Sequence, residues 1–74
     1  MPKLPIIKPR EIIRILHKIG FIDVRSKGSH LQLRKGNLLV TVPRKKRDLK
    51  PETLKSILRQ AKISVENLYT KLLF

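Results

Sequence analysis

The chain has no cysteine among its 74 residues, which excludes a disulfide framework and a thiolate metal site. A chain this short buries only about 60% of the surface that its unfolded form exposes, so a small apolar core has to stabilise it alone. No apolar run approaches the ~20 residues that span a bilayer, and no signal-peptide core precedes the early prolines. We therefore expect a single cytoplasmic domain over residues 1–74 with no membrane contact.

Acidic and aromatic side chains are scarce. Eighteen Lys and Arg stand against five Asp and Glu, which gives a formal net charge of +13 and suits a polyanionic partner such as RNA, DNA, an anionic membrane or an acidic protein. Three aromatic residues are too few for a platform that stacks several bases, so contacts to a nucleic-acid backbone should dominate. The acids are scattered, which disfavours a metal-dependent nuclease and predicts no cofactor. They are Glu11, Asp23, Asp48, Glu52 and Glu66.

The apolar residues that are present recur at regular spacings, which indicates a folded domain rather than a disordered basic chain. Residues 10–19, behind Pro9, and residues 51–61 have the spacing of amphipathic helices. Ser64 can cap a last short helix. Residues 1–8 contain prolines and are expected to form an extended arm.

Between the two main helices the pattern changes to that of strands. Residues 21–25 have the aromatic and β-branched content of a short strand, with residues 27–29 as its turn. Residues 36–37, Gly-Asn, are a two-residue hairpin signal between two alternating segments. A symmetric turn makes partner numbers sum to 73, whereas an odd-length loop would shift the pairing, and the sequence leaves both open.

The symmetric register pairs Leu33 with Val40 on the core side of the sheet. The period of two then projects His30, Gln32 and Arg34 from the other side. The order helix, three strands, helix predicts an α+β fold: a three-stranded antiparallel sheet with both helices on one face, plus a short C-terminal helix. This is the architecture of double-stranded RNA-binding domains, and the open face of the sheet is expected to be cationic.

The run KPREIIRILHKIGFIDVRSKGSHLQLRKGNLLVTVPRKKRDLKPETLKSILRQAKIS resembles the HicA toxins of toxin–antitoxin systems. The marks that carry the resemblance include KGSH at residues 27–30, VTVP at residues 40–43 and ILRQA at residues 57–61. The resemblance implies a double-stranded RNA-binding-domain-like fold and a type II endoribonuclease toxin that cleaves mRNA. It also implies a catalytic His30 and a HicB-type antitoxin. Glu52 and Lys62 depart from the family, which usually has glycine at both positions.

His30 has two interpretations. Isolated histidines are rarely catalytic, so from the residues alone an exposed strand-edge residue is the better explanation. The resemblance reverses this, because an imidazole can take a proton from a ribose 2′-hydroxyl or give one to the departing 5′-oxygen. Its candidate helpers are Lys27, Ser29, Arg34, Arg44 and solvent, and we expect Lys27 and Arg44 to bind the scissile phosphate. His17, on the wet side of the first helix, has no predicted role.

The remaining cations have two possible roles. They either keep the protein soluble or bind an RNA backbone or an acidic antitoxin surface. The near absence of acidic residues among them favours the binding role. Gly28 is explained equally well by a tight turn and by close approach of the backbone to a phosphate. A noncatalytic RNA-binding module and a basic protein whose main partner is acidic stay as alternatives. The predicted RNA-binding residues are Lys27, Gly28, Ser29, Arg34, Arg44, Lys45, Lys46, Lys55 and Arg59.

Overall fold

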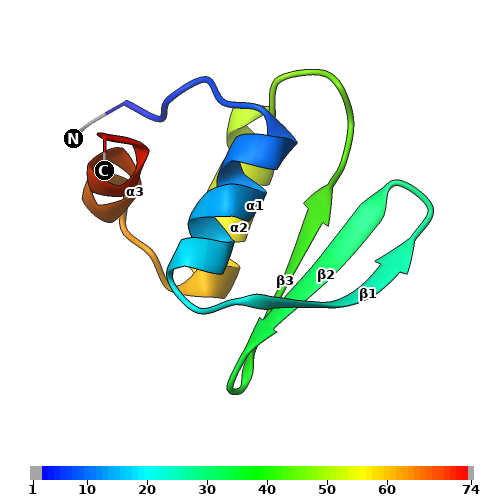
Figure 1. The fold of residues 1–74 in the computed structure, drawn as a ribbon. Coiled ribbons are helices and arrows are strands. Elements are labelled where there is room, and N and C mark those ends of the chain that lie inside the picture. The colour runs from blue at the N-terminus through cyan, green and yellow to red at the C-terminus, as the bar shows by residue number, and fades with distance from the viewer. Residues whose placement is uncertain (1–2, 74) are drawn as a thin grey trace.

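A computed structural model describes residues 3–73 and has the order α-β-β-β-α-α. Its elements are α1 (Pro9–Lys18), β1 (Ile22–Lys27), β2 (His30–Lys35), β3 (Leu38–Pro43), α2 (Pro51–Ala61) and α3 (Val65–Leu73). Helices α1 and α2 both contact β3, and α3 contacts α1 on the side away from the sheet (Figure 1). The predicted α+β fold, with two helices on one face of the sheet and a short C-terminal helix, is confirmed.

The three strands form one antiparallel sheet with β2 in the middle. Leu33 pairs with Val40 and His30 pairs with Pro43, so the predicted register, with partner numbers that sum to 73, is confirmed. The turn between β2 and β3 has Gly36 at φ +59 in its first position. Glycine adopts this backbone at little cost, which explains why a two-residue loop forms here and fixes the register.

The first strand differs from the prediction. It runs from Ile22 to Lys27 instead of over residues 21–25, and only residues 28–29 form its turn. Pairing with β2 extends it, because Ser26 and Lys27 face partners on that strand although their own β-propensity is low. The pairing shifts at Val24, where the extra residue behaves as a β-bulge.

The core lies between the sheet and the helices. The four sheet residues predicted for it, at positions 31, 33, 40 and 42, are at most 5% exposed. No residue of β1 is buried, so the helices cover β2 and β3 while β1 extends beyond them (Figure 1). The whole buried set is Ile7, Ile12, Ile15, Leu16, Phe21, Leu31, Leu33, Val40, Val42, Leu54, Ile57, Leu58, Ala61 and Leu68.

The second helix also closes the edge of the sheet. The side chain of Gln60 accepts a hydrogen bond of 3.1 Å from the backbone N–H of Thr41, which points away from β2. The helix ends at Lys62, a non-glycine residue with φ 57 and ψ 45. In this left-handed conformation the N–H of Ile63 reaches the carbonyl of Leu58 at 3.0 Å and satisfies it.

The N-terminal arm, residues 3–8, contains no helix or strand, and residues 1–2 of the predicted arm lie outside the described residues. Ile7 is buried, and its carbonyl accepts a hydrogen bond of 2.9 Å from the N–H of Leu49. The hydroxyl of Tyr69 on α3 donates to the carbonyl of Lys3. The arm is therefore held against the rest of the protein at both ends. Over residues 3–73, no helix has the length and apolar character needed to cross a bilayer.

Candidate functional site

His30 is the first residue of the central strand and is exposed. Its neighbours across the sheet are Lys27 on β1 and Pro43 on β3. Because Leu31, the next residue, is buried under the helices, the alternation of side chains places His30 on the open face. The imidazole therefore stands at one end of that face, where a large ligand can approach it.

An open pocket with a volume of about 550 Å³ lies against His30. Two cations line it, Lys27 beside the histidine and Arg25 one row further along the sheet. No carboxylate lines it, so its charge is positive. The full lining is Arg25, Lys27, Gly28, Ser29, His30, Gln32 and Thr41. The predicted neighbours at positions 27–29 are thus together with His30.

The turn that carries this pocket is held in place. Gly28 has φ +58, and a Cβ added to it would meet no atom within 4 Å. The turn therefore needs glycine for its backbone conformation, and the space above it is open. The carbonyl of Ser29 accepts a hydrogen bond from the N–H of Arg44, just after β3. This bond ties the turn beside His30 to the far strand.

Arg34 shares the open face but lies at the other end of β2, opposite Ile22 and Leu39. Four residues of extended strand separate it from His30, which corresponds to about 13 Å at ~3.3 Å per residue. Arg34 therefore lies outside the His30 pocket, beside the exposed Ile22 (63%) and Leu39 (44%).

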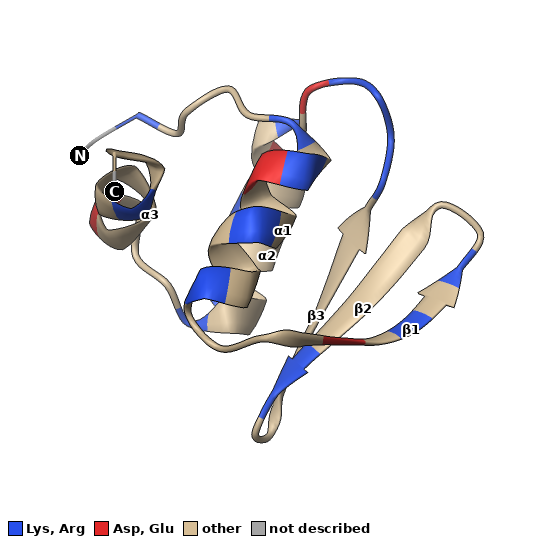
Figure 2. Ribbon diagram, viewed as in Figure 1, with Lys and Arg blue, Asp and Glu red and all other residues tan. Residues whose placement is uncertain are grey.

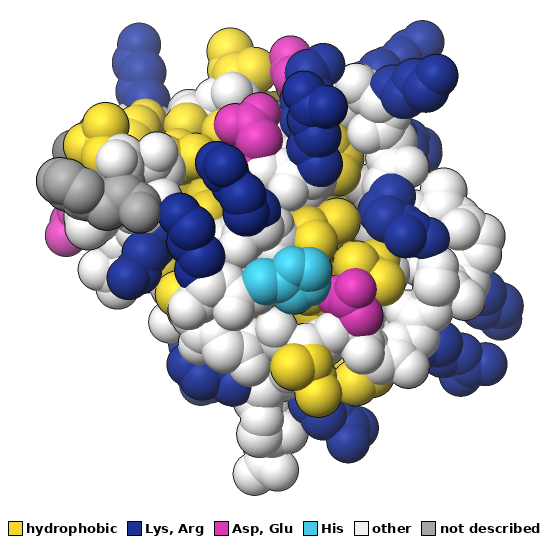
Figure 3. Space-filling model, in the orientation of Figure 1, with side chains coloured by type: hydrophobic (Ala, Val, Ile, Leu, Met, Phe, Trp, Pro, Cys, Tyr) yellow, Lys and Arg dark blue, Asp and Glu magenta, His cyan; other side chains and the backbone are white. Residues whose placement is uncertain are grey.

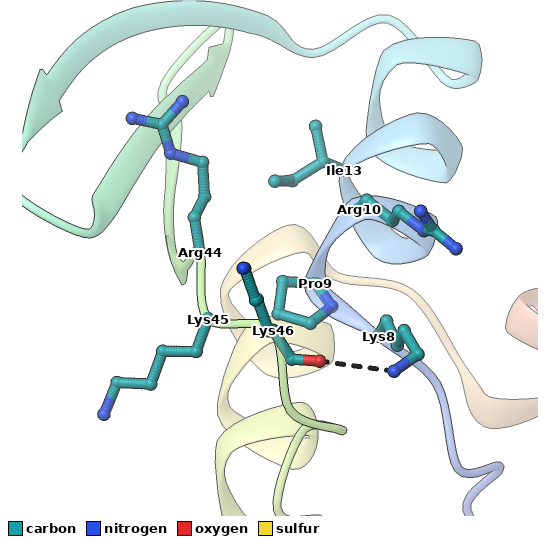
Figure 4. A pocket seen from close by; sticks show the side chains of 7 residues that line it. All are labelled: Lys8, Pro9, Arg10, Ile13, Arg44, Lys45 and Lys46. Carbon is teal, nitrogen blue, oxygen red and sulfur yellow. Dashed lines mark hydrogen bonds between the residues drawn. The ribbon is translucent and has the colours of Figure 1, made fainter.

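The side chain of Arg44 also points away from His30, although its backbone is bonded to the neighbouring turn. Its guanidinium donates to the hydroxyl of Ser26, which pairs with Leu31 and so faces the helix side of the sheet. Together with Lys45 and Lys46, Arg44 lines a second pocket beside the start of α1 (Figure 4). The structure therefore separates Arg44 from Lys27, although both were expected at one phosphate.

Lys55 and Arg59 lie in a third place, on the surface of α2. They line a pocket that also includes Lys3 and Leu4 of the N-terminal arm. The predicted cations are thus divided among three places: the open sheet face, the loop after β3 and the α2 surface. Figure 2 shows Lys and Arg positions on α1, on the loop after β3 and on the sheet, with few acidic positions between them.

Two features were missed by sequence reasoning. Arg25 was not predicted as a site residue. Extending the predicted strand, residues 21–25, to Lys27 would have placed Arg25 on the same face as Lys27 by two-residue alternation. His17 on α1 is hydrogen-bonded to Asp23 on β1, with 2.7 Å between Nε2 and Oδ1. Both side chains are about half exposed, and Figure 3 shows a histidine against an acidic side chain on the face it draws. No local pattern signals a pair that joins a helix to the following strand.

The acidic side chains do not gather. Within the described part of the chain, no group of three or more His, Cys, Asp or Glu lies close enough together to hold a metal ion. Asp23 binds His17, and Asp48 lies 4.0 Å from the ammonium of Lys8. The histidine on the open face has cations rather than carboxylates around it.

Fold and site together define a small basic α+β protein whose open sheet face presents a histidine beside two cations of β1. A family model described as the HicA toxin of bacterial toxin–antitoxin systems matches residues 9–63, more than half of the chain. The chain belongs to the HicA toxin family. The match runs from the start of α1 past the end of α2 and includes His30. No curated protein gives a significant match to the chain.

Proposed function

We propose that this protein is an endoribonuclease toxin that cleaves mRNA in the cytoplasm without a metal ion, and that His30 is its acid/base catalyst. Membership in the HicA family supports the toxin role. The observation that carries the proposal is the exposure of His30 on the open face, in a pocket with two cations and no carboxylate.

The proposed reaction uses the ribose as its own nucleophile. With a phosphodiester in the pocket, His30 removes the proton of the 2′-hydroxyl, and the 2′-oxygen attacks the adjacent phosphorus. The bond to the 5′-oxygen then breaks, which leaves a 2′,3′-cyclic phosphate and a 5′-hydroxyl. Because the pocket is open, water can protonate the leaving oxygen. The other histidine of the sequence, His17, lies on α1.

The cations have a separate part in this mechanism. Negative charge develops on the equatorial oxygens of phosphorus in the transition state, and Lys27 and Arg25 line the pocket in which these oxygens would lie. No atom lies within 4 Å of the position that a Cβ on Gly28 would take, so a phosphate can approach the backbone of this turn closely. Binding and charge stabilisation are thus assigned to β1, and proton transfer to β2.

Neutralisation by a HicB-type antitoxin is part of the proposal. A chain with a net charge of +13 attracts an acidic protein as well as RNA, and an antitoxin over the open face would exclude substrate from His30. The toxin would then be active only when the antitoxin is removed.

The test compares RNA with DNA of the same sequence, each with EDTA present. We expect the RNA to be cut and the DNA, which lacks the 2′-hydroxyl, to stay intact. Cleavage that stops with EDTA and returns with Mg²⁺ would exclude this mechanism. Binding of RNA without any turnover would instead support a noncatalytic RNA-binding module.

A further inference from the structure

A second cationic pocket lies between the start of α1 and the loop after β3 (Figure 4). We call it the loop cleft; its volume is about 450 Å³. Pro9 and Ile13 give it an apolar part, and every other lining residue is a cation. These cations are Lys8, Arg10, Arg44, Lys45 and Lys46, which come from two segments far apart in the sequence.

The two walls of the loop cleft are fixed to each other. The ammonium of Lys8 donates to the carbonyl of Lys46 at 3.2 Å, and this bond is drawn in Figure 4. Further along, the N–H of Leu49 donates to the carbonyl of Ile7 at 2.9 Å. A ligand therefore finds the cleft already formed, so its binding loses little free energy in ordering the loop.

The charge of the loop cleft is largely uncompensated. Asp48 is 4.0 Å from Lys8, and over residues 3–73 no carboxylate lies within ion-pair distance of the other four cations. Figure 4 shows Arg44 and Lys46 beside the cleft, while the side chains of Arg10 and Lys45 extend outward at its margins. Cations on both sides of the cleft repel each other, and a bound anion relieves this repulsion. The arrangement therefore favours an anionic ligand over a neutral one.

The loop cleft adjoins the His30 pocket. Ser29 lines the His30 pocket, and its carbonyl is bonded to the N–H of Arg44, which lines the cleft. The guanidinium of Arg44 reaches Ser26 on the helix side of the sheet, whereas Lys27 lies on the open face. A polymer with one phosphate at His30 reaches the cleft by turning around the end of β3, from the open face to the helix side, where Pro9 and Ile13 offer an apolar surface to a ribose or a base.

We propose that the loop cleft binds the stretch of RNA that flanks the scissile phosphate, with Lys46 beside the cleft and Arg10 at its margin as phosphate contacts. This inference rests on the proposed function, because it takes His30 as the place of cleavage. The two pockets lie at the same end of the sheet, linked by the bond between Arg44 and Ser29, which favours RNA that spans both over an acidic protein as the occupant. The cleft adds affinity for substrate and takes no part in proton transfer.

The test measures binding to a 2′-O-methylated RNA, which has no free 2′-hydroxyl and cannot be cut by the proposed reaction. Arg10→Gln is compared with Arg14→Gln, one turn further along the same helix and outside the cleft. We expect about a tenfold loss of affinity for Arg10→Gln, as for one lost hydrogen bond to a charged group, and little change for Arg14→Gln. The slope of log K against log salt should fall by ~0.7 for Arg10→Gln.

A second pair of variants checks the other wall. Lys46→Gln should weaken binding as Arg10→Gln does, whereas Lys71→Gln, on α3, should not. In cleavage assays the cleft variants should raise KM and leave kcat unchanged.

Equal losses for the cleft variants and their controls would overturn the inference, since diffuse charge would then explain binding. Unchanged RNA affinity with weakened binding of a HicB-type antitoxin would overturn it too, because the cleft would be a protein interface. Cleavage by the wild-type protein is measured in the same series. Its absence would count against the proposed function, while the affinity ratios report on the cleft alone.

Discussion

Replacement of Lys62 by glycine is expected to stabilise the protein. Lys62 ends α2 with φ 57 and ψ 45, where the Cβ of an L-residue approaches the neighbouring carbonyl. The backbone already makes the two hydrogen bonds of a left-handed helix end, from Lys62 to Arg59 and from Ile63 to Leu58.

The expected gain is a difference of two effects. The left-handed conformation costs about 1–2 kcal/mol for an L-residue, and glycine removes this cost. Glycine also makes the unfolded chain more flexible, which costs about 0.4–1 kcal/mol. A net gain of about 0.5–1 kcal/mol remains, which corresponds to about 2–8 °C in Tm for a domain of this size.

Thermal unfolding followed by circular dichroism measures this gain. Lys62→Ala is the matched control, because it removes the ammonium group but keeps the Cβ. We expect Lys62→Gly to unfold at a higher temperature than both the wild type and Lys62→Ala. If the glycine and alanine variants unfold together, charge removal explains the effect and the reasoning from the backbone is refuted.

Three further outcomes are expected. Leu33→Ala, at a fully buried position, should cost about 2–5 kcal/mol in urea unfolding, and a loss below this range would contradict the assigned core. Gln60→Ala should cost about 1 kcal/mol because the N–H of Thr41 loses its partner, whereas Gln60→Glu, which keeps an acceptor, should cost less. If about five phosphates are contacted, log K for RNA should fall with log salt at a slope of roughly −3.5 to −4.5; a slope near zero would exclude a backbone-bound RNA.

The hairpin that carries His30 was predictable because its signals are local. Alternating apolar residues on both sides of Gly36 and Asn37 fix the turn, the register and the buried face at the same time. The placement of His30 on the open face of the sheet follows from the alternation of side chains along the strand alone. Helix α2 was predictable for a similar reason, since Pro51 starts it and its apolar residues share one stripe.

Features that depend on how separate elements meet were not predictable. The bulge at Val24 arises from pairing with β2, and no residue type there signals it. Arg44 belongs to a loop, so its direction is set by the hydroxyl of Ser26 on another strand. The hydrogen bond between His17 and Asp23 depends on the angle between α1 and β1, which no local sequence pattern encodes.

The most direct test of the account compares the two histidines. His30→Ala and His17→Ala each remove one imidazole, and His17 lies on the first helix, away from the open sheet face. Loss of an acid/base catalyst typically slows a reaction by about 10²–10⁴-fold. With both variants shown to be folded, we predict that His30→Ala loses RNA cleavage to this extent and His17→Ala keeps it. Equal cleavage by the two variants would contradict the assignment of His30 as the catalyst.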